Sequence, residues 1–125
     1  MNAAILISNN PRISELKSAK LQMNIYQDKT ALQILSLVRD FVHKNHRLLT
    51  HPLHSSLKPN ETPFRTVLIS ATPELSLHLE SLQMIENAIH YYQNFLKDKP
   101  YKTRSAEILA DFSLIDFDLI KKAIT

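Results

Sequence analysis

The chain has 125 residues, of which 44% are hydrophobic, and 15 Lys and Arg against 12 Asp and Glu give it a net charge of +3. These values are typical of one globular domain with a packed core. The sequence contains no Gly, no Cys and no Trp. The absence of Gly excludes a Gly-rich phosphate loop, a dinucleotide-binding turn and a nucleophile elbow. The absence of Cys excludes a thiolate nucleophile, a thiolate-bound metal and a disulfide, so we expect a cytoplasmic protein without a cofactor.

Four segments of the first half carry recognisable patterns. Residues 3–8 are an apolar run followed by Asn-Asn-Pro, which predicts a buried strand closed by a turn; the run is too short to span a membrane. Residues 12–20 have room for a brief helix, and apolar and polar residues alternate over 21–26, as in a half-exposed strand. From Asp28, a candidate N-cap, apolar residues recur every three or four positions up to residue 45, which predicts an amphipathic helix.

The second half begins with a short segment, residues 46–50, which we interpret as a third strand that ends before a proline. Residues 51–64 contain three of the six prolines and predict a long loop. The β-branched run 66–70 predicts a fourth strand, and the apolar spacing over 79–96 predicts a second long helix. After residue 100 the pattern favours two short helices, the second with a capping box that starts at Ser113.

This order of elements predicts an α/β fold, with a small, mainly parallel sheet of about four strands flanked by helices and a helical C-terminal tail. The helix at 28–45 is then expected to be a right-handed crossover between parallel strands. We expect residues 1–100 to form the α/β core domain and residues 101–125 to form a helical extension of the same domain.

The net charge arises from residues 39–65, which hold five basic and two acidic side chains and four of the six histidines. If the first and third predicted strands are parallel neighbours, the Asn pair after the first strand shares a sheet edge with His51, where open α/β sheets bind ligands. Donors of the long loop could then surround a small carboxylate or phosphate. The candidate ligand-binding residues are Asn9, Asn10, His51, Lys58, Asn60, Glu61 and Thr62. The alternative is that these side chains are solvated or cap turns.

Metal binding and acid-base catalysis are two other possible chemistries of the same stretch. His43 and His46, and likewise His51 and His54, are spaced like pairs of metal ligands, but this spacing is unspecific and we expect no metal. An acid-base pair would use His51 and Glu61, although neither a nucleophile nor a cofactor motif accompanies them.

The C-terminal tail suggests a different class of function. Its apolar residues exceed one helix face, so the tail could form a homodimer while the loop at 51–64 clamps a partner protein. These apolar residues are Phe112, Leu114, Ile115, Phe117, Leu119 and Ile120. Nucleic-acid binding is disfavoured, because Asp116 and Asp118 would repel phosphates from the second tail helix.

One stretch of the sequence resembles a known family. His-Arg-Leu-Leu-Thr-His-Pro-Leu at 46–53, with Ser-Leu-Lys-Pro-Asn-Glu-Thr-Pro-Phe at 56–64, resembles the GrdX family, and the similarity covers most of residues 4–96. The sequence departs from the expected pattern at Asn45 and His54, which stand where a small residue such as Gly is expected, and Asn45 can replace Gly as a left-handed helix cap. The resemblance implies a small cytoplasmic accessory protein encoded with glycine, sarcosine or betaine reductase components. Those components are then candidate partners, and small carboxylates or acetyl phosphate are candidate ligands.

Overall fold

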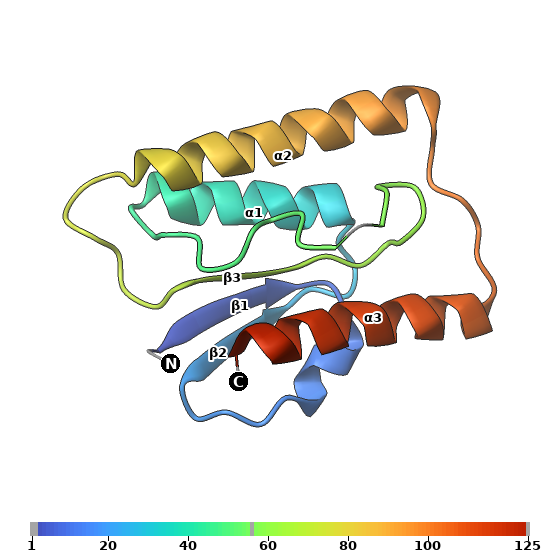
Figure 1. Ribbon diagram of the computed structural model, residues 1–125, viewed down its shortest axis with the longest axis horizontal. Coiled ribbons are helices and arrows are strands. Elements are labelled where there is room, and N and C mark those ends of the chain that lie inside the picture. Colours follow the sequence, from blue (N-terminus) through green and yellow to red (C-terminus); the bar gives the residue numbers. More distant parts are fainter. Residues whose placement is uncertain (1–2, 56, 125) are drawn as a thin grey trace.

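The computed structural model describes residues 3–55 and 57–124 (Figure 1), so Ser56 of the predicted loop lies outside the described residues. Within these ranges the chain forms three strands, one 3-10 helix and three α-helices. In chain order they are β1 (Ala4–Ser8), η1 (Pro11–Glu15), β2 (Leu21–Ile25), α1 (Ala31–His43), β3 (Thr66–Ser70), α2 (Leu79–Asp98) and α3 (Ala106–Ile124).

The sheet has the order β2-β1-β3, with β1 parallel to β2 and antiparallel to β3. The three strands predicted at 3–8, 21–26 and 66–70 are confirmed. The third predicted strand, 46–50, is wrong, because this segment contributes a single isolated bridge between Leu48 and Ile69. The sheet of the described residues is therefore mixed and three-stranded, not mainly parallel with four strands.

The edge pairing beside β3 stops for a local reason. Leu49 N–H donates to the carbonyl oxygen of Leu68 at 2.8 Å, but Leu68 N–H donates to the Thr50 side-chain oxygen at 3.0 Å instead of a backbone carbonyl. The chain then turns back through the loop at 51–64 and enters β3 in the opposite direction to β1. Consequently α1 joins β2 to an antiparallel strand, and its predicted role as a crossover between parallel strands is wrong.

Both ends of α1 have a defined cap, a capping box at the start and a left-handed residue after the end. The N-cap is Thr30 and not Asp28: Thr30 Oγ1 accepts from Gln33 N–H at 3.1 Å, and Gln33 Oε1 accepts from Thr30 N–H at 2.9 Å, which completes a capping box. After the helix, Asn45 has a φ of 73°. Asn tolerates this left-handed conformation better than most residues, so the prediction of Asn45 as a helix cap is confirmed.

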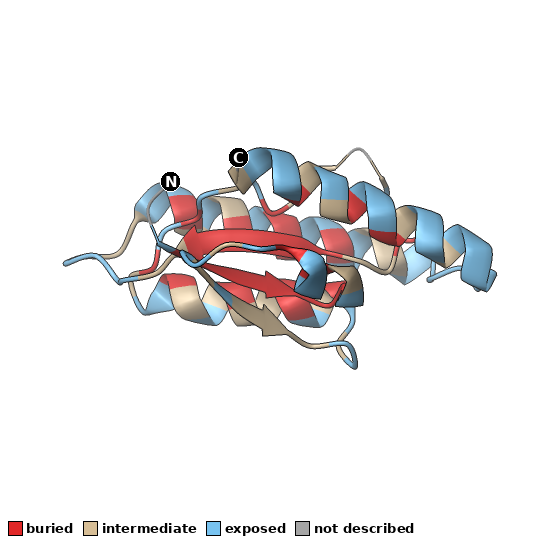
Figure 2. Ribbon diagram, turned by 90° about the horizontal axis from the view of Figure 1, so that it is seen from below, coloured by how far each residue is buried: buried red, intermediate tan, exposed pale blue. Residues whose placement is uncertain are grey.

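The alternation of side chains along β1 creates two separate cores on the two faces of the sheet (Figure 2). Ile5 and Ile7 face α1 and α2, while Ala4 and Leu6 face η1 and α3. β1 and β3 are mostly buried, whereas β2 is half-exposed, as its alternating sequence predicted. Figure 1 shows the resulting layers, with α1 and α2 stacked above the sheet and α3 on its other side.

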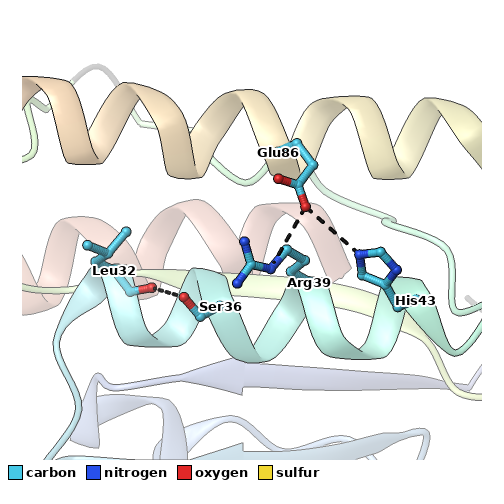
Figure 3. Close-up of polar contacts among 5 residues, drawn as sticks. All are labelled: Leu32, Ser36, Arg39, His43 and Glu86. Carbon is cyan, nitrogen blue, oxygen red and sulfur yellow. Dashed lines mark hydrogen bonds and ion pairs between the residues drawn. The ribbon is translucent and has the colours of Figure 1, made fainter.

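Polar contacts also link α1 and α2 at the surface. Glu86 Oε1 lies 3.8 Å from Arg39 Nε and 3.9 Å from His43 Nε2 (Figure 3). Ser36 Oγ donates to the carbonyl oxygen of Leu32 one turn earlier in α1. Exposed ion pairs of this kind stabilise a fold by less than about 1 kcal/mol, so the apolar interface holds the two helices together.

The tail forms one helix of 19 residues, and the prediction of two short helices is wrong. Ser113 and Asp116 lie inside α3 with their side chains buried, so they do not form a capping box. The sequence signal was misleading because the two polar residues bind groups of the sheet and leave the helix unbroken. No helix within residues 3–55 and 57–124 has the length and the apolar content that crossing a membrane requires.

Candidate functional site

The structure divides the seven predicted ligand-binding residues into two groups. Asn9, Asn60 and Glu61 line a cavity of about 440 Å³. The other four, Asn10, His51, Lys58 and Thr62, do not line it. The predicted sharing of one edge through parallel strands does not occur, because β3 enters antiparallel and brings the end of the loop, not its start, beside Asn9.

The cavity lies at the first turn of α1. Its walls come from the end of β1, the turn at 27–31, the loop end at 60–64 and the linker at 101–104 between α2 and α3. In Figure 1 this linker runs down the edge of the molecule from the end of α2 to the start of α3. Segments that are distant in sequence therefore meet at one helix N-terminus, where backbone N–H groups and the helix dipole favour negative charge.

Asn9 holds these walls in place. Its Nδ2 donates to the carbonyl oxygens of Lys29 at 3.0 Å and Pro63 at 2.7 Å, and its Oδ1 accepts from Arg65 N–H at 2.9 Å. Both amide protons and the amide oxygen are thus engaged by the backbone of two segments. Asn9 builds the cavity, and its polar atoms are already used for this purpose.

The charged groups around the cavity are three basic side chains, Lys29, Lys102 and Arg104, and two acidic ones, Asp28 and Glu61. One of the two carboxylates already has a partner, since Glu61 Oε1 accepts from Lys58 N–H at 2.8 Å. This bond closes a turn of the loop and fixes that oxygen. Basic side chains around the cavity therefore outnumber acidic ones by three to two.

Arg104 is the most informative of these basic residues. Its guanidinium lies over the ring of Phe112, 5.7 Å from the ring centroid. Its Nε atom is buried and has no hydrogen-bond partner among the described residues. A buried donor without an acceptor is uncommon in folded proteins and is energetically unfavourable, so this N–H is suited to receive an acceptor atom from a ligand.

Tyr101 approaches the helix terminus from the same linker. Burial raises the pKa of Tyr101, and hydrogen bonds to the backbone of Leu32 and the side chain of Thr30 partly oppose this rise. The phenol is therefore neutral at physiological pH and places an oxygen at the first turn of α1. An anion bound at this position would either lie next to the Tyr101 hydroxyl or take over its hydrogen bonds to the first turn of α1.

The remaining loop residues of the predicted site bond to their own loop. His51 is exposed, and its Nδ1 accepts from Leu53 N–H at 3.0 Å. Thr62 Oγ1 accepts from Phe64 N–H at 3.2 Å, while Lys58 is exposed. In the acid-base pair suggested by the sequence, His51 and Glu61 thus each accept a backbone N–H, and of the two only Glu61 lines the cavity.

Asn10 faces α3 on the other side of the sheet. It caps η1 through its Oδ1, which accepts from Arg12 N–H at 3.1 Å. Its Nδ2 donates to the carbonyl oxygen of Ser113 at 2.9 Å and to Asp116 Oδ2 at 3.0 Å. The two adjacent asparagines therefore serve two different polar clusters.

The four histidines with the spacing of metal ligands do not converge on one point. His43 faces Glu86, His46 Nδ1 lies 2.8 Å from the carbonyl oxygen of Ser70, and His51 bonds to its own loop. Both ring nitrogens of His54 are buried without a partner in the described part of the chain. No group of three or more His, Cys, Asp or Glu that could hold a metal ion occurs within residues 3–55 and 57–124.

Sequence reasoning missed the cavity residues outside the loop. These are Lys29 and Thr30 at the start of α1 and Tyr101, Lys102 and Arg104 in the linker. The available signal was the polar, basic composition of residues 97–104 between two apolar helices. Local patterns could not show that this segment passes over the N-terminus of a helix 70 positions earlier in the chain.

Comparison with known protein families shows which family the chain belongs to. A scan against protein-family models matches GrdX-like protein over residues 5–125. Searches of curated proteins and of solved structures found no match. The matched region includes the linker and α3, which the resemblance noted in the sequence did not cover. The chain belongs to the GrdX-like protein family.

Proposed function

We propose that this chain is a cytoplasmic accessory protein of glycine, sarcosine or betaine reductase metabolism that binds a small carboxylate or phosphate without converting it. The ligand occupies the cavity at the N-terminus of α1, with the end of the loop His51–Pro63 as one wall. The observation that carries this proposal is Arg104 Nε, a buried donor without a partner beside an open cavity. An anionic oxygen is the acceptor that such a donor binds most strongly.

Electrostatics and size support the same ligand class. Lys29, Lys102 and Arg104 surround the cavity together with the first turn of α1, and both kinds of group attract anions. The volume of about 440 Å³ is in the range of small-molecule sites. Asn60 is buried and lines the cavity, so its amide supplies a donor and an acceptor in the cavity wall.

The test is a binding titration by calorimetry, with thermal shifts as a second readout. Phosphate, acetyl phosphate, acetate, glycine and betaine are titrated into the wild-type protein and into Arg104→Gln. We expect at least one anion to bind, and Arg104→Gln to weaken it by roughly tenfold or more, since hydrogen bonds to charged groups contribute about 1.5–3 kcal/mol.

Arg47→Gln is the matched control, because Arg47 is exposed beyond the other end of α1 and does not line this cavity. It removes the same charge and should leave affinity unchanged. Lys58→Ala tests whether the site extends along the loop as the sequence predicted, in which case affinity falls. Equal losses in Arg104→Gln and Arg47→Gln would show that only net charge matters, and no binding by any of the anions would end the proposal.

A second candidate function, an interaction module, is favoured by apolar residues on α3. Ile108, Leu114 and Ile115 are exposed by 40%, 44% and 41%. We propose a second copy of the chain, or a reductase component, as the protein that covers them. Light scattering at high concentration should show a dimer that Ile115→Glu dissociates, and a monomer at every concentration would remove the homodimer.

A further inference from the structure

A second polar cluster lies under α3, on the opposite face of the sheet from α1 and α2. Asp116 is only 7% exposed, and its Oδ2 accepts from Thr66 Oγ1 at 2.5 Å and from Asn10 Nδ2 at 3.0 Å. Thr66 lies at the start of β3 and Asn10 in the turn after β1. The sheet therefore provides the donors, and α3 provides the carboxylate.

Hydrogen bonds within the sheet orient the two donors. Asn10 N–H donates to Ser8 Oγ at 2.9 Å, and Ser8 Oγ lies 2.7 Å from Thr66 Oγ1. Because the Thr66 hydroxyl proton is donated to Asp116, the Ser8 hydroxyl must be the donor to Thr66. Each bond in this chain polarises the next one, so Thr66 is set as a donor that points away from the sheet.

Two further buried side chains belong to neighbouring segments, of which Arg65 contacts Tyr92 of α2 on the other face of the sheet. Arg65 is 1% exposed and donates through Nε to the Tyr92 hydroxyl at 2.8 Å, and it has no carboxylate within ion-pair distance in the described part of the chain. Both ring nitrogens of His54 are buried without a partner, and the charges of Asp116 and Arg65 act on this histidine in opposite directions. Of these two side chains, His54 is the one on which the charge of Asp116 acts.

α3 has few buried side chains by which to hold its position. Of its 19 residues three are buried, Ser113, Asp116 and Ile120, and two of these three are polar. Ser113 Oγ donates to Asn10 Oδ1 at 2.9 Å and accepts from Arg12 Nε at 3.1 Å. Phe117 and Ile124 also pack, partly buried, against the apolar core of this face. The remaining attachment of α3 is made of hydrogen bonds of Ser113 and Asp116, which water or a ligand can replace.

We propose that Asn10 and Thr66 form a carboxylate-binding site of the sheet, that Asp116 is its resident occupant, and that release of α3 opens this site to a small external monocarboxylate. The site is separate from the cavity at α1, which contains none of these three residues. Asp116 then has the role of an internal competitor, and the external carboxylate takes up the two hydrogen bonds that Asp116 gives up.

The variant Asp116→Ala tests the site directly. It leaves the donors in place, so its Tm should fall by roughly 5 to 10 °C because two buried donors lose their acceptor. Acetate or formate at about 100 times its Kd should restore about half or more of this loss, whereas chloride at equal ionic strength and neutral acetamide should not.

Three controls separate this site from other causes. Asp116→Asn keeps the site filled, so acetate should shift its Tm no more than it shifts that of the wild type. Asn10→Ala combined with Asp116→Ala removes a donor and should abolish the response to acetate that exceeds the wild-type response. Arg104→Gln combined with Asp116→Ala should keep that response, because Arg104 belongs to the α1 cavity; failure of the cavity proposal therefore leaves this result unchanged. A loss of Tm that acetate, chloride and acetamide restore equally would overturn the proposed site.

Hydrogen exchange of the wild-type protein tests the displacement of α3 and does not depend on the folding of a variant. Amides of α3 should exchange about tenfold or more faster than those of α1, and concentrated acetate should speed the exchange of α3 alone. If α3 and α1 exchange at the same rate by global unfolding, α3 is a fixed part of the fold and the proposal is wrong.

Discussion

The two faces of the sheet are covered by helices that are attached by different forces. α1 and α2 present ten buried positions, of which nine are apolar or aromatic, and Ser81 is the exception. α3 presents three, of which Ser113 and Asp116 are polar. Apolar packing is non-directional and resists water, whereas hydrogen bonds can be exchanged with water or with another ligand. We refer to α1 and α2 as the fixed layer and to α3, which we propose to be displaceable, as the replaceable layer.

Leu35→Ala should produce the largest effect, because it removes a fully buried side chain from the fixed layer. We expect the free energy of unfolding to fall by about 2–5 kcal/mol, as is usual for a large-to-small change in a core. Urea denaturation measures this loss. Leu75→Ala is the matched control, since Leu75 is fully exposed and its truncation should change stability by less than about 0.5 kcal/mol.

Asn10→Ala should have a smaller effect that is confined to the replaceable layer. It removes the cap of η1 and the bonds to Ser113 and Asp116, and we expect a loss of about 2–3 kcal/mol. Hydrogen exchange should show faster exchange in α3 and little change in α1. Equal acceleration in both helices would contradict the division of the domain into two layers.

Stability should also depend on pH through His54. Burial lowers the pKa of His54 below its usual value of 6.5; Arg65 and the His51 ring lower it further, and Asp116 and the backbone of His51 oppose the shift. Above pH 6.5 the histidine is neutral in both the folded and the unfolded chain. As the pH falls below 6.5 the unfolded chain binds the proton first, so stability is lost until the folded pKa is reached.

Thermal unfolding between pH 8 and pH 5 measures this dependence. His54→Leu removes the titrating group, and the difference in Tm between wild type and variant should change in this range. The matched control is His90→Leu, which replaces an exposed histidine of α2. A wild-type profile identical in shape to that of His54→Leu would show that His54 does not contribute.

The smallest effect is expected for the surface contact between α1 and α2. Arg39 and Glu86 are 36% and 44% exposed, and their closest atoms are 3.8 Å apart. Glu86→Gln should therefore destabilise the protein by less than about 1 kcal/mol, and the effect should decrease as salt is added. A loss comparable to that of Leu35→Ala would mean that charge, and not apolar packing, holds the fixed layer.

The sequence predicted those elements whose pattern is local. The three strands, the two long helices and Asn45 as a left-handed cap followed from apolar spacing and from the conformational preferences of single residues. The prediction of a strand at 46–50 was wrong although two leucines between polar residues are typical of a strand. Leu68 N–H donates to the side chain of Thr50 in place of a backbone carbonyl, and this ends the pairing after one bridge. The strand direction of β3 was not predictable, since the long loop before it can lead into either orientation.

For the candidate site, the sequence identified one wall. Asn9, Asn60 and Glu61 were predicted and do line the cavity, although their role in ligand binding remains a prediction. Lys29, Tyr101 and Arg104 were missed because they belong to segments that carry no motif of their own. The sequence predicted Asn10 at the same site as Asn9. Consecutive residues at the end of a strand point to opposite faces of a sheet, so Asn10 instead donates to Asp116 of α3.

By itself, the sequence determined the classes of chemistry that this chain lacks, its α/β character, and which face of each long helix is buried. These properties depend on composition and on periodicity, which act over a few residues. Only the tertiary structure decided the mixed sheet, the single long α3, and the meeting of the linker with the first turn of α1. Contacts between residues 50 to 100 positions apart depend on which packing buries both cores at once, and no local pattern contains that information.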